Sequence, residues 1–145
     1  MTVFAPPPEI IRLATQNPYP ARLEPAGGTA ETRSPLCGSK VIVDVTLDDG
    51  DRVAAIGTRV NACAFGQAAA TLMAEHAVGR SVAELVATRA ALAAWIAGEG
   101  EAPDWPGIEH LRPDRLNLTR KGSVQLAFQA VAEAALAAQE ARAHA

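Results

Sequence analysis

The spacing of apolar residues changes near Ala62 in this chain of 145 residues, and this change constrains the fold more than any other feature. Before it, residues 40–47 alternate along a β-branched run, which predicts a strand with Val41, Val43, Val45 and Leu47 on one face. After it, apolar residues recur every three or four positions, which predicts helices. Strands followed by helices favour an α+β fold in which the helices pack on one face of the sheet.

The predicted elements follow from local signals. About three antiparallel strands are expected, at residues 29–34, 40–47 and 52–61. An Asp-Gly turn over residues 48–51 should join the last two, because Gly50 supplies the positive φ of a hairpin turn. Helices are predicted at residues 9–16, from residue 62 to the Gly79 cap, at 81–89 and 90–97, and from 121 or 123 to about 142. In the last helix, the residues expected to face inward are Val124, Phe128, Val131, Ala135 and Leu136.

Size and charge limit the possible functions. The length predicts a single domain over residues 1–145, with residues 1–8 flexible. A formal net charge of −3 without a basic block argues against a nucleic-acid partner, and no apolar run is long enough to cross a membrane. The N-terminus lacks the features of a secretory signal, so we expect a cytoplasmic protein with reduced thiols. A structural disulfide is the less favoured alternative.

The chain contains two cysteines, Cys37 and Cys63, which flank the predicted hairpin. A hairpin returns its ends to one place, so both thiols should lie at the same end of the sheet. Two soft ligands brought together in this way suggest metal, cluster or persulfide chemistry. The alternative is that each cysteine is simply a small buried residue.

Several motifs occur in an order that resembles a known family. They are Asn17-Pro18, Pro35-Leu36-Cys37-Gly38, the Asp-Gly hairpin, Ala62-Cys63 before a helix of small residues, and Val78-Gly79-Arg80-Ser81-Val82-Ala83-Glu84. The order and spacing of these motifs resemble those of the U-type iron–sulfur cluster assembly scaffolds, the group of IscU, SufU and the N-terminal domain of NifU. The resemblance covers roughly residues 17–138.

The resemblance implies a non-enzymatic carrier that binds iron or a transient [2Fe–2S] cluster, or zinc in its place. A cysteine desulfurase would supply sulfur, and apo iron–sulfur proteins would receive the cluster. Cys37 and Cys63 match two of the family's cysteine ligands, whereas Ser39 replaces its aspartate and Ser123 its third cysteine. Hydroxyls are harder and less acidic donors than thiols, so this ligand set should bind metal more weakly. A homodimer giving two cysteines from each subunit would restore four thiolates.

These substitutions leave other interpretations open. The chain can instead be a degenerate relative that acts as a metal-free binding or regulatory module in the same pathway, and a sulfurtransferase with Cys63 as persulfide carrier is a more distant possibility. Ser123 is favoured as the N-cap of the last helix over a ligand role, and Lys121 as a solvated side chain. His110 is a weaker candidate ligand.

Overall fold

The computed structural model describes residues 5–144, so the expectation of a flexible segment at residues 1–8 falls partly outside it. Pro8 is already the first residue of a helix. The elements, in chain order, are α1 (Pro8–Ala14), β1 (Gly28–Arg33), β2 (Lys40–Leu47), β3 (Val53–Asn61), α2 (Ala64–Ala77), α3 (Val82–Ile96), the 3₁₀ helices η1 (Ile108–Leu111) and η2 (Pro113–Arg115), and α4 (Leu118–Ala143).

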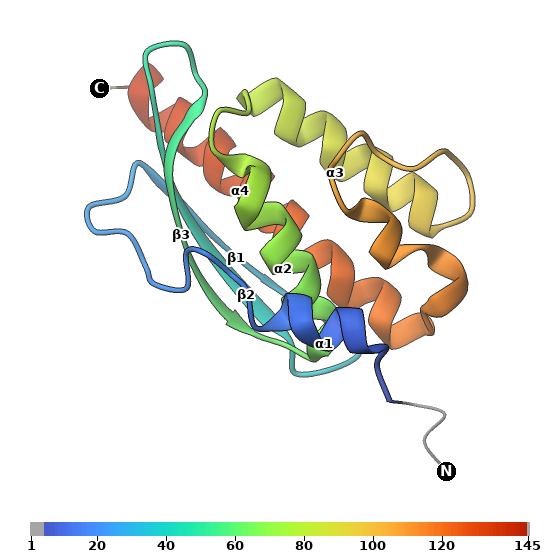
Figure 1. Ribbon diagram of the computed structural model, residues 1–145. Helices are drawn as coiled ribbons and strands as arrows, with labels where there is room; N and C mark the ends of the chain where they lie inside the picture. The colour runs from blue at the N-terminus through green and yellow to red at the C-terminus, as the bar shows by residue number, and fades with distance from the viewer. Residues whose placement is uncertain (1–4, 145) are drawn as a thin grey trace.

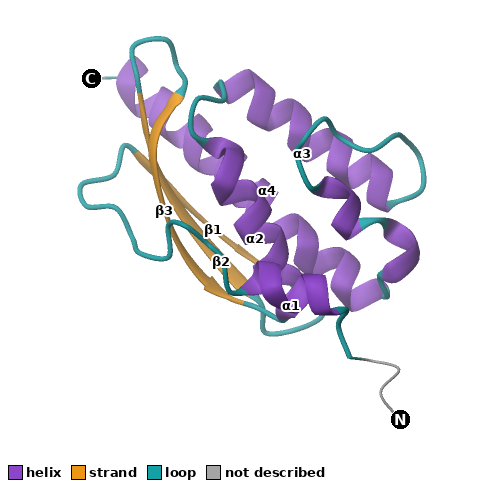
Figure 2. Cartoon of the chain, in the orientation of Figure 1, coloured by secondary structure: helices purple, strands orange, loops and turns teal. Residues whose placement is uncertain are grey.

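The elements form two layers, a twisted sheet and a group of helices on one side of it (Figures 1 and 2). Strand β2 lies in the centre and pairs antiparallel with β1 and β3. Helix α4 packs across β1 and β2, and α2 lies between α4 and β3. Val41, Val43 and Val45 are fully buried, as their alternation predicts. The α+β class with helices on one face is confirmed.

The helices of this layer pack mainly through small side chains. The residues of α4 that contact the core include Val124, Phe128 and Val131, all of which are buried as predicted. Leu136 is 38% exposed, so its inward placement was wrong. The buried stripe continues instead through alanines of the neighbouring positions, and Leu136 lies outside that stripe because successive helical residues are rotated by about 100°. Within the described residues, none of the helices combines the length and apolar character that crossing a bilayer requires.

The hairpin turn lies where it was predicted, but its left-handed residue is Asp51, with φ of 57°, and not Gly50. Asp48 provides the reason. Its carbonyl accepts a hydrogen bond from the Asp51 N–H at 3.1 Å, and its Oδ1 accepts from the N–H groups of Gly50 and Arg52 at 2.9 and 3.0 Å. These bonds close a tight turn before Asp51, which then takes the left-handed conformation that Asp tolerates better than most residues.

Helix α3 is continuous, whereas two helices meeting near Arg89 and Ala90 were predicted. No glycine or proline interrupts this part of the sequence, so nothing breaks the backbone hydrogen bonding there. The start of α3 is as predicted: the Ser81 Oγ accepts from the Glu84 N–H, and the Glu84 carboxylate accepts from the Ser81 N–H, each at 3.1 Å. This is the capping box expected from the sequence.

Helix α4 begins at Leu118, earlier than the predicted start at residue 121 or 123. Asn117 is its N-cap, because the Asn117 Oδ1 accepts a hydrogen bond from the Arg120 N–H at 2.9 Å. The favoured interpretation of Ser123 as the N-cap is therefore wrong. Ser123 lies in the second turn, on the buried side of the helix.

The face of the sheet opposite the helices carries a buried carboxylate, Asp44. Arg22 Nε and Nη2 donate to its two oxygens at 2.6 and 3.1 Å, Thr29 Oγ1 donates at 2.6 Å and the Leu23 N–H at 3.1 Å. Gly57 lets the loop between α1 and β1 approach this face of the sheet, since a Cβ at Gly57 would lie 2.5 Å from the Ala21 carbonyl oxygen. Asp44 thus holds the loop between α1 and β1 against the sheet.

We expect Asp44→Asn to lower the free energy of unfolding at neutral pH by about 2–4 kcal/mol, because it removes a charged acceptor from several donors. Burial alone would raise the pKa of Asp44, but the hydrogen bonds from Arg22, Thr29 and Leu23 outweigh it and lower that pKa. The stabilisation is therefore complete above the unfolded value of about 3.9 and is lost as the pH falls through the lower folded value. Urea unfolding of both proteins at neutral and acidic pH measures the difference in their free energies of unfolding.

The matched control is Asp49→Asn, an exposed carboxylate in the hairpin turn, which should change stability by less than about 0.5 kcal/mol. Equal unfolding midpoints for Asp44→Asn and Asp49→Asn at neutral pH would contradict the role given to Asp44.

Candidate functional site

Both cysteines lie at the end of the sheet where β2 begins and β3 ends. Cys37 is in the turn that leads into β2, and Cys63 is the residue immediately before α2. The pairing of Lys40 with Asn61 closes this end of the hairpin, so the two cysteines are brought together as predicted. A shallow cavity of about 340 Å³ is lined by residues of both segments and by Thr119 of α4; they are Cys37, Gly38, Ser39, Asn61, Ala62, Cys63 and Thr119.

Two serine hydroxyls connect the two thiols. The Cys37 thiol donates to the Ser39 Oγ at 3.1 Å, and the Ser123 hydroxyl donates to the same Ser39 oxygen at 3.4 Å. The Ser123 Oγ lies 3.4 Å from the Cys63 Sγ. All four residues singled out in the sequence therefore form one chain of neighbours, from three separate segments. Their role as ligands stays a prediction.

The serines form the inner side of this arrangement and the cysteines the outer side. Ser123 is fully buried and Ser39 is 5% exposed, whereas Cys37 is half-buried and Cys63 is exposed. The sulfur atoms are thus accessible from solvent, and the hydroxyls support them from within. Neither cysteine is in a disulfide, which rules out in this structure the alternative of a Cys37–Cys63 bridge.

Gly66 in the first turn of α2 permits Ser123 to reach this position. A Cβ at Gly66 would lie 2.4 Å from the Ser123 Oγ and 2.8 Å from the Ala62 Cβ, closer than real side chains approach. The sequence analysis missed Gly66. The only signal was a glycine near a helix start, where it costs stability relative to alanine and so suggests a packing requirement.

The surroundings of Cys37 favour its thiolate form. When Cys37 is ionised its sulfur can only accept, and hydrogen bonds from the Ser39 and Ser34 hydroxyls and from the Ser39 backbone N–H then lower the pKa of Cys37 against the opposing effect of partial burial. A thiolate is both the nucleophilic and the metal-binding form of cysteine. Ser34 was also missed by the sequence analysis, because only the turn before β2 brings it to the thiol.

No charged side chain is among the described residues that line the thiol cavity. Two basic residues of α4 lie in other surroundings: the Arg120 guanidinium is over the Phe65 ring, 4.7 Å from its centroid, and Lys121 lines a separate groove. The lowered pKa of Cys37 therefore comes from hydrogen bonds and not from a neighbouring cation.

The other candidate ligands do not join the thiols. Within residues 5–144, no group of three or more His, Cys, Asp and Glu side chains is arranged to hold a metal ion. His110 lies in η1, where its N–H donates to the Gly107 carbonyl and its own carbonyl accepts from Arg115, and it does not line the thiol cavity.

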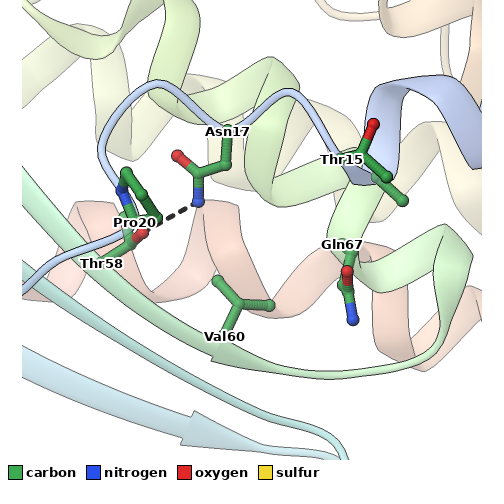
Figure 3. Close-up of a pocket in the computed structure, with 7 residues that line it drawn as sticks. Thr15, Asn17, Pro20, Thr58, Val60 and Gln67 are labelled. Carbon is green, nitrogen blue, oxygen red and sulfur yellow. Dashed lines mark hydrogen bonds between the residues drawn. The ribbon is translucent and has the colours of Figure 1, made fainter.

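A second cavity, of about 250 Å³, lies on the other side of the junction between β3 and α2 (Figure 3). Asn17 projects toward it from the loop after α1, and its Nδ2 donates to the Thr58 Oγ1 at 2.9 Å while its Oδ1 accepts from the Tyr19 N–H. Gln67 enters from α2. Asn17, one of the motif residues noted in the sequence, therefore holds the loop to β3 and does not reach the thiols.

We predict that Gly66→Ala costs about 1–3 kcal/mol of stability, because its methyl group must displace Ser123 or Ala62. Gly122→Ala is the matched control: it also lies in a helix, and its Cβ would make only an ordinary contact of 3.5 Å with the Ser34 Oγ, so alanine should be neutral or slightly stabilising. Urea unfolding compares the two variants. A Gly66→Ala protein as stable as Gly122→Ala would contradict the close packing inferred here.

We also predict that Cys37 reacts with iodoacetamide at a lower pH than an ordinary thiol of pKa about 8.5, and that Ser39→Ala raises the pH of half-maximal alkylation. Mass spectrometry of the Cys37 peptide follows the reaction. Cys63→Ser serves as the control, since it leaves the hydrogen bonds to Cys37 in place. An unchanged profile in Ser39→Ala would show that Ser39 does not stabilise the thiolate.

Comparison with known proteins adds independent evidence. No family model and no curated protein matches the sequence. Among solved structures, the N-terminal part of a nitrogen-fixing NifU-like protein from Brucella abortus is 30% identical, with a TM-score of 0.83 over 92% of this chain and 94% of that chain. A protein from the thermophile Fervidobacterium islandicum AW-1, described as an iron–sulfur cluster assembly scaffold for the SUF system, is 18% identical with a TM-score of 0.80. It covers 89% of this chain and 95% of its own, and at this identity it supports the fold alone.

The first of these similarities extends over nearly the whole length of both proteins, and it agrees with the order of motifs noted in the sequence. The chain therefore belongs to the U-type iron–sulfur cluster assembly scaffold family, which includes the NifU-like N-terminal domains.

Proposed function

We propose that this protein is an iron–sulfur cluster assembly scaffold, which holds iron or a transient [2Fe–2S] cluster as cargo through Cys37 and Cys63. The observation that carries the proposal is the placement of both sulfur atoms at one accessible cavity, each within hydrogen-bonding reach of a buried serine hydroxyl. Family membership supports the same role.

Family membership favours iron or a [2Fe–2S] cluster over zinc as the cargo. Thiolates are soft, charged donors that suit both iron–sulfur clusters and zinc. Each normally takes four ligands, so the two thiols that line the cavity do not by themselves decide between them. We therefore place iron or [2Fe–2S] ahead of zinc on the family alone.

Ser39 and Ser123 are better suited to support the thiolates than to bind metal. Serine hydroxyls are hard donors and are not ionised at neutral pH, and Ser123 is fully buried with its oxygen already within reach of Cys63 and Ser39. Hydrogen bonds to the sulfur atoms stabilise the thiolate form and tune the properties of a bound cluster. In this proposal the two serines position the sulfur atoms, and only the cysteines bind the cargo.

The protein would act as a carrier and not as an enzyme. The exposed position of Cys63 allows a partner to deliver or remove cargo directly, without a conformational gate. We expect a cysteine desulfurase as the source of sulfur and apo iron–sulfur proteins as recipients, in the reducing setting of the cytoplasm.

A second candidate function follows from the small number of ligands. Since no third His, Cys, Asp or Glu joins the thiols within the described residues, a metal-free module that binds proteins of the same pathway is the alternative. In that case Cys37→Ser and Cys63→Ser would keep the partner binding and cellular role of the protein.

We predict that anaerobic reconstitution with ferrous iron and sulfide gives a coloured protein that retains iron after desalting. Cys37→Ser and Cys63→Ser should each retain at least about tenfold less iron, because each removes a thiolate ligand. Ser123→Ala should still bind iron but lose it faster to a chelator, since it removes a supporting hydrogen bond. Iron analysis and visible absorbance measure these outcomes. A colourless, iron-free wild-type protein would instead favour the metal-free module.

A further inference from the structure

The face of the sheet opposite the helices carries a group of basic side chains at its thiol end. Arg33 of β1 lies directly opposite Lys40 of β2, and Lys40 lies opposite Asn61 of β3. In the next row of the same face, Arg59 lies opposite Ile42. Directly opposite residues share a face, and diagonal neighbours such as Lys40 and Arg59 are about 7–8 Å apart. Arg33, Lys40 and Arg59 therefore form one cluster, which we call the basic patch.

The basic patch is unfavourable in the free protein. Like charges directly opposite each other in a sheet are destabilising, and Arg33 and Lys40 are such a pair. Glu31 accepts a hydrogen bond from the Arg33 Nε at 2.7 Å, which lowers the pKa of Glu31, and the charges of Arg33 and Lys40 lower it further. Among the described residues, Lys40 and Arg59 make neither an ion pair nor a side-chain hydrogen bond. One carboxylate thus compensates three cations, and local conflicts of this kind are typical of functional surfaces.

The basic patch is open to solvent and has a defined boundary. Arg33 and Arg59 are exposed, and Ile42 is half-buried between them. In the row beyond Ile42, Asp44 is occupied by Arg22, and the loop between α1 and β1 covers that part of the face. The open area therefore combines three cations with one apolar side chain at its centre.

The basic patch adjoins the thiol cavity. Ser39 immediately precedes Lys40, and Asn61 lies opposite Lys40 and two residues before Cys63. Both Ser39 and Asn61 line the cavity. Since neighbouring residues of a strand are only about 3.3 Å apart, a protein seated on the patch also reaches the thiols.

The rest of the molecule has the opposite charge. The chain has a formal net charge of −3, so the basic patch is a local exception. Four exposed acidic residues follow α3 with no lysine or arginine among them, and Figure 1 shows this segment among the helices, away from the sheet; they are Glu99, Glu101, Asp104 and Glu109. This asymmetry turns the open sheet face toward a negatively charged partner. Three cations are too few to hold a nucleic acid on a chain that is negative elsewhere.

We infer that the basic patch is the docking surface for an acidic protein, which places carboxylates against the three cations and an apolar side chain on Ile42. Docking relieves the repulsion between Arg33 and Lys40, and it brings the partner to the edge of the thiol cavity. The docking is argued from the surface itself. That the docked protein exchanges cargo with the thiols rests on the proposed function.

The test is an NMR titration of the complete ¹⁵N-labelled protein with the peptide acetyl-Glu-Glu-Leu-Glu-Glu-amide. We expect saturable shifts of the amide signals of residues 31–33, 40–42 and 59–61, which weaken in about 0.3 M salt because the contacts are exposed. Peptides with glutamine or lysine in place of glutamate should cause no such shifts. Tighter binding of an oligothymidylate at the same residues would assign the patch to nucleic acid and overturn the inference.

A charge reversal separates docking from a structural role. Lys40→Glu should weaken peptide binding at least about tenfold, because it places a carboxylate in the middle of the patch. The same change should raise the midpoint of urea unfolding, because it replaces the like-charge pair with Arg33 by an opposite-charge pair. Arg89→Glu is the matched control, since it makes the same change of charge on α3, in the layer of helices, and should bind the peptide like the wild type.

The remaining outcomes keep the two proposals apart. Peptide shifts confined to another surface, or equal peptide affinity of Lys40→Glu and the wild type, would overturn the docking surface. Iron retention after reconstitution is measured on the same proteins, and Lys40→Glu should retain as much iron as the wild type. Loss of iron in Lys40→Glu would place Lys40 in the cargo site and refute a separate docking role. An iron-free wild type would refute the proposed function and leave the peptide result standing.

Discussion

The close approach of α2 and α4 is the constraint on which the rest of the structure depends. Aromatic residues make up only 4% of the chain, so the core is built largely from alanine, valine and leucine. Helices faced with alanine can pack at short distance, and at the sheet end of the contact the distance is so short that only glycine fits at position 66 opposite Ser123. This packing positions a hydroxyl from the last helix between two cysteines that belong to the hairpin and to α2.

The same packing explains how Ser39 and Ser123 fit at the two positions where the resemblance implies an aspartate and a third cysteine. Ser39 and Ser123 are small enough to be buried beside Gly66, and they satisfy each other's hydrogen bonds while they contact the sulfur atoms. The outcome is a site with a polar, rigid inner side and a reactive outer side. Such a site suits cargo that is held weakly and exchanged at the surface, which agrees with a carrier function.

Two long loops are each fixed to the core by specific residues. On the face of the sheet opposite the helices, Asp44 and Gly57 hold the loop between α1 and β1. In the helix layer, the Trp105 indole N–H donates to the Leu72 carbonyl at 2.8 Å and holds the loop before α4. Trp105 also packs edge-on against Phe128 of α4, with ring centroids 5.3 Å apart. Long connections are thereby fixed to the core by single residues with several hydrogen bonds or packing contacts.

The sequence by itself determined the class of fold, the alternating strands, the capping box at Ser81 and the meeting of the two cysteines, because each depends on local pattern or on the simple geometry of a hairpin. It failed at two positions where neighbouring residues compete for one local role. Asn117 took the cap that was assigned to Ser123, and Asp51 took the left-handed conformation expected of Gly50. Only the tertiary structure brought Ser34 and Gly66 to the thiol site and left Leu36 and Leu118 exposed near it. The reason is physical: burial and the approach of one helix to another depend on the whole packed core, and no short stretch of residues encodes them alone.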